Sequence, residues 1–309
     1  MSPAGAAVAH VPVMLERCLE ALAPQPEQWL VDATFGAGGH SRALLARGAK
    51  VIGIDQDPAA HAHAEALRRD LRTAGLADPS ERFRFAQGNF ADLGAHLEGL
   101  GLPSQAGVQG VLLDLGVSSM QLDEGERGFA FRHDGPLDMR MGGEGPSAAD
   151  VVNDWSFEDL AAALHRYGEE RHSRRLARAI VSERERAPIT TTGQLADVLQ
   201  RAYPRGPRRD HPARRTFQAL RIVVNDELGA LERGLAAAAE ALAVDGRLVV
   251  LAYHSLEDRL VKRCLRERSD LEPLTKRPLQ ATPAEVSANP RARSAKLRAA
   301  RKITARSAP

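Results

Sequence analysis

Short apolar runs with strand character recur along the chain, and helical patterns separate most of them. The runs are residues 29–33, 51–55 (VIGID), 82–86 (RFRFA), 110–115 (GVLLDL) and 247–253 (RLVVLAY). Strands that alternate with helices are typical of βαβ units, which form a parallel sheet with helices on its faces. The pattern therefore predicts an α/β fold.

The fifth run is delayed by roughly 130 residues, which predicts an insertion between the fourth and fifth strands. The insertion begins with an irregular stretch, 125–146, that contains too many turn formers for a regular element. Three helices are then expected from helical spacing and capping residues. The first follows Ser156, the second lies near 171–186, and the third follows Thr191, with Gln194 completing a capping box, and ends near 202.

One long helix is predicted over about 213–242, because apolar residues recur there at steps of three and four and form a single stripe. The stripe is Phe217, Leu220, Val224, Leu228, Leu231, Leu235, Ala238 and Leu242. This helix would return the chain to the sheet. We therefore expect a core formed by residues 1–119 and 213–309, the latter ending in a basic tail, and an inserted helical domain over 120–212, for which the resemblance given below implies RNA recognition.

Length and composition are those of a globular protein. The chain has 309 residues, of which 43% are hydrophobic, which is enough for one large or two ordinary domains. Its two cysteines, Cys18 and Cys264, cannot build a disulfide framework, which favours a reducing compartment. The N-terminus lacks the pattern of a signal peptide, and no run of 18 apolar residues is present. We expect a soluble cytoplasmic protein without a membrane span.

The net charge of +2 says little, but the basic residues are clustered. Residues 201–221 hold seven arginines and one acid, and residues 291–306 hold seven Lys or Arg and no acid. Clusters of this kind suit a phosphate backbone, although a solvated basic surface would have the same composition. The best RNA-binding candidates lie in the proline-broken stretch of the first cluster. They are Arg205, Arg208 and Arg209.

The stretch DATFGAGGHS, residues 32–41, is a glycine-rich turn between the first strand and a helix. Gly36-x-Gly38-x-x-Ser41 nearly fits the dinucleotide-binding fingerprint, and Asp55 ends the next strand, where an acid binds ribose hydroxyls. Ser41 replaces the third glycine, and Asp32 precedes the loop. Both features favour a nucleoside without a pyrophosphate, as in the opening loop of methyltransferases that use S-adenosylmethionine, although glycines required only by the turn would look similar.

Two more residues follow strands, at the edge where a doubly wound sheet binds its ligands. Phe90, after the third strand, is a candidate for stacking on adenine, or else a core residue. Asp114 ends the fourth strand inside an apolar run, where a carboxylate without a function would be costly.

Long motifs then give a specific resemblance. They are HVPVMLERCLEAL, DATFGAGGHS, LGVSSMQLDEGERGFAFRHDGPLDMRM, RYGEERHSRRLARAI, HPARRTFQALRIVVNDEL, YHSLEDRLVKR and NPRARSAKLR. In this order they closely resemble the ribosomal RNA small subunit methyltransferase H family, also called RsmH or MraW, over nearly the whole chain. Two positions depart from the usual pattern: Met120 replaces Pro, and Tyr253 replaces Phe.

The resemblance implies a Rossmann-like class I methyltransferase core with an inserted all-α domain. It implies S-adenosylmethionine as cofactor and methylation of the exocyclic amine of a cytosine in the decoding region of 16S rRNA, within the small ribosomal subunit. The cofactor residues that it implies are Gly38, Gly39, His40, Asp55, Phe90, Asp114 and Gln121.

The catalytic group is left open by the sequence. The lone pair of the cytosine amine is conjugated into the ring, which makes the amine a poor nucleophile. A group that accepts a hydrogen bond from the amine protons would localise this lone pair. Alignment of the methyl donor with the amine supplies much of the remaining rate enhancement. The candidates are Asp114, Ser118, Ser119 and His254, of which His254 could equally be structural. No Cys/His cluster suggests a metal.

Two other functions remain open at this point. The glycine loop with Asp55 would also suit an NAD-linked oxidoreductase, which would bind NAD and not S-adenosylmethionine. A non-enzymatic RNA-binding assembly factor would bind RNA without transferring a methyl group. The sequence leaves the oligomeric state open, and a homodimer is one of the options.

Overall fold

The structure, a computed structural model, describes residues 12–102, 107–206 and 211–304, without the side chain of Ser119. The chain divides into two compact units. One, which we call the sheet unit, comprises Met1–Gly116 and Ala230–Pro309, and the other, the helical unit, comprises Val117–Gly229. The helical unit thus continues past the predicted boundary at 212, because residues 213–229 group with the insertion and not with the sheet.

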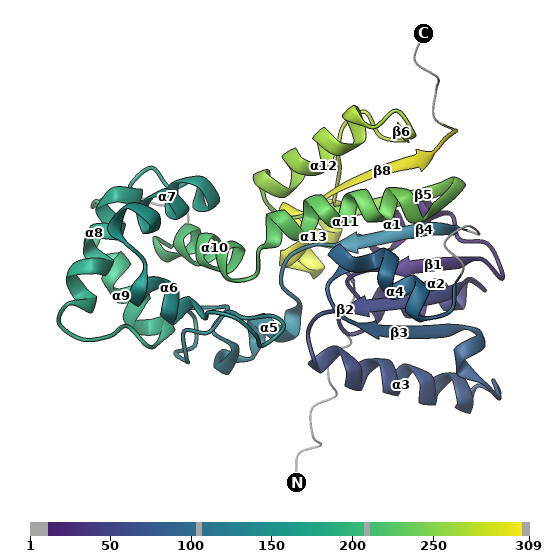
Figure 1. Cartoon of the computed structure of the whole chain (residues 1–309), viewed down its shortest axis with the longest axis horizontal. Helices are drawn as coiled ribbons and strands as arrows, with labels where there is room; N and C mark the ends of the chain where they lie inside the picture. The colour runs from purple at the N-terminus through teal and green to yellow at the C-terminus, as the bar shows by residue number, and fades with distance from the viewer. Residues whose placement is uncertain (1–11, 103–106, 207–210, 305–309) are drawn as a thin grey trace. The chain divides into compact units, whose positions relative to one another are not determined.

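The sheet unit is built on one sheet of eight strands in the order β3-β2-β1-β4-β5-β8-β6, with β7 paired to β8 (Figure 1). Strands β1 to β5 are parallel to one another, whereas β8 runs antiparallel to β5, β6 and β7. The strands are β1 Trp29–Asp32, β2 Lys50–Asp55, β3 Phe83–Gln87, β4 Val108–Asp114, β5 Leu242–Ala252, β6 Leu271–Pro273, β7 Leu279–Gln280 and β8 Lys296–Lys302. All five predicted strands are confirmed, and with them the Rossmann-like α/β core.

Helices cover both faces of this sheet (Figure 1). Neighbouring strand residues alternate between the faces, so Leu30 and Leu112 pack into one core while Val31 and Leu113 pack into the other. The helices on the first face are α1 Leu15–Leu22, α2 Gly39–Ala46 and α3 Ala59–Thr73, and those on the second are α4 Leu93–Gly99, α11 Glu227–Ala241 and α12 Ser255–Glu267. The carboxyl ends of β1 to β4 therefore lie at one edge of a buried sheet.

The helical unit has its own core. Its helices are α5 Ser119–Asp123, α6 Ala148–Asp154, α7 Phe157–Gly168, α8 Ser173–Arg184, α9 Thr192–Ala202 and α10 Ala213–Val224. The predicted caps are present: Ser156 Oγ accepts the N–H of Asp159, and Thr191 forms a capping box with Gln194. The described part of this unit contains no strand, and α6 is an element that the sequence pattern did not predict. None of the helices described in either unit combines the length and apolar character that a membrane span requires.

The predicted single helix over 213–242 is wrong, because α10 ends at Val224 and α11 begins at Glu227. Asp226, between them, has a positive φ of 46°. The side chain of Asn225 accepts the N–H of Met141 and donates to the carbonyl of Met139, both at 2.8 Å. These contacts with a distant loop fix the break, while the apolar stripe continues across it.

The predicted basic tail is folded into the sheet unit, where its described part contains a short 3-10 turn, Pro290–Ser294, and strand β8. Its cations pair with acids of the sheet unit: Arg298 with Asp258 at 2.7 Å, and Lys302 with Asp270 at 2.7 Å. Arg301 also lies 2.7 Å from a carboxylate oxygen, that of Glu272. Much of the positive charge of residues 291–306 is therefore neutralised within the fold. Arg306, like Arg208 and Arg209, lies outside the described residues.

Candidate cofactor and catalytic site

The turn between β1 and α2 is shaped by its glycines. Gly36 and Gly38 have positive φ values of 54° and 77°. A Cβ on Gly38 would lie 2.7 Å from the ring of Phe35, and one on Gly39 would lie 2.5 Å from Pro12. A Cβ on Gly36 would meet nothing nearer than 4.0 Å. Packing thus requires Gly38 and Gly39, whereas Gly36 leaves the surface of the turn open to a ligand.

Asp55, at the end of β2, is tied to this turn. Its Oδ2 accepts the N–H of Gly36 at 2.7 Å, and its Oδ1 accepts the N–H of Asp57 at 2.8 Å. Burial raises the pKa of Asp55 to about 6, although these two hydrogen bonds act in the opposite direction. Each carboxylate oxygen keeps a further lone pair, so Asp55 can also accept two hydroxyl groups.

Asp114, at the end of β4, connects three other segments. Its N–H donates to Thr34 Oγ1 at 2.7 Å. The hydroxyl of Tyr253 donates to its Oδ1 at 2.6 Å, and its Oδ2 lies 3.5 Å from Nε2 of the buried His40. The structure therefore brings together the predicted residues His40 and Asp114, and adds Tyr253 to them. The side chain of Asp114 remains 23% exposed, so a ligand can reach it.

The two groups beside Asp114, His40 and Tyr253, both have shifted pKa values. Burial lowers the pKa of His40, but Asp114 and Asp32 raise it, and the net shift is upward. Burial and the nearby Asp114 raise the pKa of the Tyr253 hydroxyl well above its usual range. Tyr253 is therefore a protonated donor at neutral pH, and His40 is biased toward the imidazolium.

Asp32, at the end of β1, is a buried acid with unused accepting capacity. Its Oδ2 accepts a hydrogen bond from Ser41 Oγ at 2.7 Å, but its Oδ1 has no hydrogen-bond partner among the described residues. Burial raises its pKa, while His40 and Ser41 lower it. A buried oxygen in this state is satisfied by an added donor, and the ammonium group of a ligand is one candidate.

Phe90 begins a short turn after β3 and is only half-buried. Asn89 fixes this turn by accepting the N–H of Ala91 at 2.9 Å and donating to the side chain of Gln56 at 2.9 Å. A Cβ on Gly234 of α11 would lie 2.4 Å from the Phe90 ring, so the ring packs directly on that helix. Stacking of its remaining surface on adenine stays a prediction.

Two predicted residues lie in the helical unit and have local roles there. Ser118 Oγ accepts the N–H of Gln121 at 3.2 Å, and Gln121 Oε1 accepts the N–H of Ser118 at 2.9 Å. This capping box begins α5. The cofactor role of Gln121 and the catalytic role of Ser118 remain predictions. The side chain of Ser119 lies outside the described structure.

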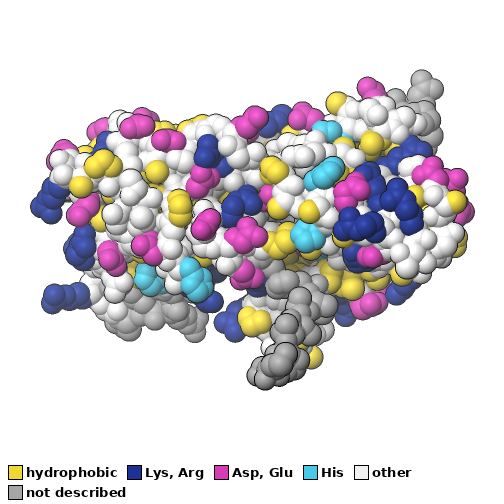
Figure 2. Space-filling model, turned by 90° about the horizontal axis from the view of Figure 1, so that it is seen from below, with side chains coloured by type: hydrophobic (Ala, Val, Ile, Leu, Met, Phe, Trp, Pro, Cys, Tyr) yellow, Lys and Arg dark blue, Asp and Glu magenta, His cyan; other side chains and the backbone are white. Residues whose placement is uncertain are grey.

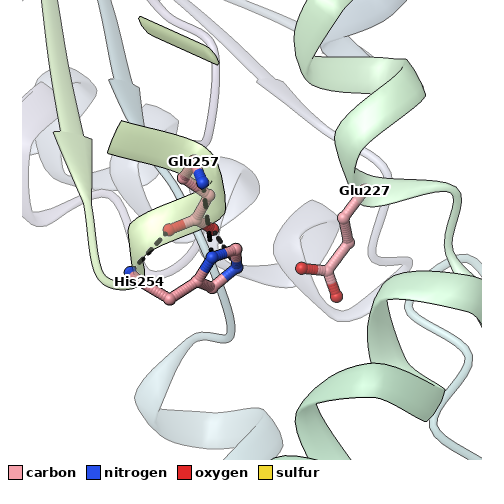
Figure 3. A group of neighbouring side chains, drawn as sticks. All are labelled: Glu227, His254 and Glu257. Carbon is pink, nitrogen blue, oxygen red and sulfur yellow. Dashed lines mark hydrogen bonds and ion pairs between the residues drawn. The ribbon is translucent and has the colours of Figure 1, made fainter. Parts of the chain in front are cut away.

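His254 is the N-cap of α12, as Figure 3 shows. Its Nδ1 accepts the N–H of Glu257 at 3.3 Å, and Glu257 Oε2 accepts the N–H groups of Tyr253 and His254 at 2.7 and 3.1 Å. Glu227, also drawn, belongs to the helical unit, where it accepts two hydrogen bonds from Arg221. Capping gives His254 a structural role, and its catalytic role stays a prediction. The backbone of Tyr253 is fixed by the same Glu257 carboxylate.

Among the RNA-binding candidates, Arg205 is exposed just after α9, and Arg208 and Arg209 lie outside the described residues. On the face shown in Figure 2, Lys and Arg side chains are interspersed with Asp and Glu side chains. The RNA-binding role of the proline-broken stretch therefore stays a prediction.

The model of the MraW methylase family matches residues 7–303. The chain belongs to this family. It is 54% identical over 296 residues to the ribosomal RNA small subunit methyltransferase H of Deinococcus radiodurans, which covers 96% of this chain and 90% of that protein. The protein of the same name from Deinococcus deserti is 53% identical over 299 residues, with 97% and 95% covered. A solved rRNA methylase from Streptococcus thermophilus has a TM-score of 0.44 at 11% identity, with 96% and 100% covered.

The family membership confirms the resemblance inferred from the motifs and contradicts an NAD-linked oxidoreductase. Two residues that contact Asp114 were not predicted as part of the site: Tyr253 and Thr34. A signal for Tyr253 was available, because it directly follows β5 and so lies at the same edge of the sheet as Asp114.

Proposed function

We propose that the protein is an S-adenosylmethionine-dependent methyltransferase that acts on ribosomal RNA of the small subunit. Its target is the exocyclic amine of a cytosine in the decoding region of 16S rRNA. The observation that carries this proposal is the carboxylate of Asp114, held by Tyr253 and His40 at the ligand edge of a sheet in a methylase family. The curated relatives named as small subunit rRNA methyltransferases support the substrate.

The residues at this edge fit S-adenosylmethionine, whose sulfonium supplies an activated methyl group. Asp55 would accept the ribose hydroxyls, and the open turn at Gly36 would admit the nucleoside. The unsatisfied oxygen of Asp32 would accept the ammonium of the methionine portion. Phe90 would lie on the adenine. The family resemblance adds Gly38, Gly39, His40 and Gln121 to this set.

Asp114 would provide a proton acceptor for the target amine. The transfer forms one N–C bond, breaks one C–S bond and releases one proton from the amine nitrogen. A carboxylate that accepts an amine proton localises the nitrogen lone pair, and it takes up the proton as the bond forms. Tyr253 and His40 hold the two oxygens of Asp114, so its orientation is set before the base arrives. The amine lies on the pairing edge, so the base must be unpaired or flipped out.

Transfer of a labelled methyl group from S-adenosylmethionine to small ribosomal subunits that lack the modification tests the proposal. After digestion, nucleoside mapping should locate the label as N4-methylcytidine in the decoding region. Label on another base or in another region would correct the target. Binding of RNA without any transfer would instead identify a non-enzymatic assembly factor.

Cofactor binding is expected to depend on pH through Asp55. The ionised carboxylate accepts the ribose hydroxyls, and its pKa is about 6, so this form is present above pH 6 and is lost as the pH falls. Affinity for S-adenosylmethionine should therefore decrease about tenfold between pH 7 and pH 5. Calorimetry at the two pH values measures this change. Asp55→Asn should bind more weakly but without the pH dependence, and an equal dependence in that variant would assign it to another group.

Replacing Tyr253 with Phe is expected to slow methyl transfer about three- to tenfold. The variant keeps the ring but removes the hydrogen bond to the Asp114 carboxylate, and water replaces part of what is lost. The effect should fall on kcat, with KM for S-adenosylmethionine unchanged. Ultraviolet titration supplies an independent readout, because one of the three tyrosines should ionise well above the usual range in the wild type and be missing from the variant. An unchanged kcat would show that Asp114 is oriented without the hydroxyl of Tyr253.

A further inference from the structure

Four exposed arginines, Arg171, Arg174, Arg175 and Arg178, form a row along the start of α8, and we call it the α8 arginine row. The positions are three and four residues apart and so share one side of the helix and of the turn before it. Within the described residues, none of the four forms an ion pair with a carboxylate. The row is therefore positive charge that the helical unit does not neutralise.

The row also lies at the N-terminal end of its helix, where positive side chains are unfavourable. The N-terminus of a helix carries partial positive charge, which favours acids and disfavours arginines. The first turn of α8 contains Arg174 and Arg175 and no acid, whereas Glu183 lies near its C-terminal end. Of these two, Arg175 makes no ion pair or ring contact within the described residues, so nothing there offsets its unfavourable position.

The guanidinium groups are held in place rather than left free. Arg174 and Arg178 lie over the ring of Phe157, at 5.0 and 5.7 Å from its centre. The buried Glu170 accepts the N–H of His172 at 2.8 Å and so fixes the turn that carries Arg171. Ordered arginines lose less side-chain entropy when they bind a ligand.

Several other cations in the predicted basic stretches are already paired, although Arg205 is exposed and has no ion pair among the described residues. Those of β8 pair with acids of the sheet unit, and Arg201 of α9 lies 3.2 Å from Glu183. From residue 171 to residue 178 a helix rises roughly 10 Å, enough to follow several phosphates of one strand. We propose that the α8 arginine row binds the phosphate backbone of the substrate RNA. This inference rests on the proposed function, and the proline-broken stretch stays a separate candidate contact.

The test uses the full-length protein and an in vitro transcript of the decoding region of 16S RNA. Arg171→Gln combined with Arg175→Gln removes two charges that have no partner among the described residues, so the fold should be retained. Binding at 0.1 M salt should weaken on the order of tenfold, and the slope of log affinity against log salt should decrease by about 1.4 to 1.8. Affinity for S-adenosylmethionine should not change.

Arg186→Gln combined with Arg201→Gln is the matched control, because it removes the same charge from the same unit at two positions that share the carboxylate of Glu183. Equal losses in the two double variants would overturn the row, since binding would then follow net charge alone. An unchanged salt slope in the first variant would also overturn it. The proposal would also be overturned if the first variant lost binding to phosphatidylserine vesicles but kept RNA binding, because the row would then bind a membrane surface.

Methyl transfer by the wild type separates the two proposals. If the wild type methylates small subunits and the first double variant binds RNA normally, the row is wrong and the proposed reaction stands. If the wild type methylates no small-subunit RNA and the double variant still loses transcript binding, the row stands and the proposed reaction is wrong.

Discussion

Replacing Asp114 with Asn is expected to slow methyl transfer by about two to four orders of magnitude, the usual contribution of a positioned proton acceptor. Asn keeps the shape of the side chain and an oxygen that can accept from Tyr253, but it has no charge with which to take the amine proton. The side chain is partly exposed at the ligand edge, so the change reaches the reacting nitrogen directly. Single-turnover transfer to small subunits at saturating S-adenosylmethionine measures the rate, and calorimetry measures separately what Asp114 contributes to cofactor binding.

A second readout of Asp114→Asn does not depend on activity. The charge of Asp114 helps to raise the pKa of His40 against the effect of burial, so the pKa of His40 should fall in the variant. Proton NMR of the imidazole, assigned with a His40→Gln variant, follows it. Asp70→Asn is the control, because Asp70 is an exposed acid on α3 that pairs with Arg42. A variant with normal transfer and a lowered His40 pKa would make Asp114 a purely structural residue.

The parts of the fold that the sequence predicted are those with a local cause. A buried parallel strand is a continuous apolar run, so β1 to β5 were each found within a few residues. Capping residues act on their own helix, so the starts of α7 and α9 were also found. The break between α10 and α11 has no local cause, because Asn225 is held by a loop more than 80 residues earlier in the chain. The continuous apolar stripe across it therefore predicted one helix.

Charge was the feature that the sequence predicted least well. The composition of residues 291–306 is basic, yet the acids that neutralise its strand are Asp258, Asp270 and Glu272, which precede it by tens of residues. Burial of Asp258 opposes ionisation, but Arg298 and Lys296 hold its pKa below the usual range. The number of cations in a segment therefore does not give its free positive charge. Partners that come from other strands and helices decide it.

The site was predictable to the extent that ligand residues follow strands. Asp55 and Asp114 could be named because the carboxyl ends of parallel strands meet at one edge, whereas His40 was implied only by the family resemblance. The hydrogen bond between Tyr253 and Asp114 joins residues 139 positions apart, and no spacing rule connects them. His254 was an open candidate because a histidine after a strand suits either catalysis or structure. Only the geometry of its Nδ1 identifies an N-cap.

Replacing Asp55 with Ala is expected to weaken S-adenosylmethionine binding by about 1–3 kcal/mol, or roughly 5- to 150-fold, because two ribose hydroxyls lose their acceptor. The substitution also leaves the N–H groups of Gly36 and Asp57 without their partner, and this can loosen the turn. Asp55→Asn separates the two effects, since its single amide oxygen can accept from one of those groups but carries no charge. Calorimetry above pH 7 gives the affinities, and thermal unfolding shows whether each variant is folded. Folded variants that bind as tightly as the wild type would remove Asp55 from the cofactor site, and the acceptor at this edge would then be sought at Asp32.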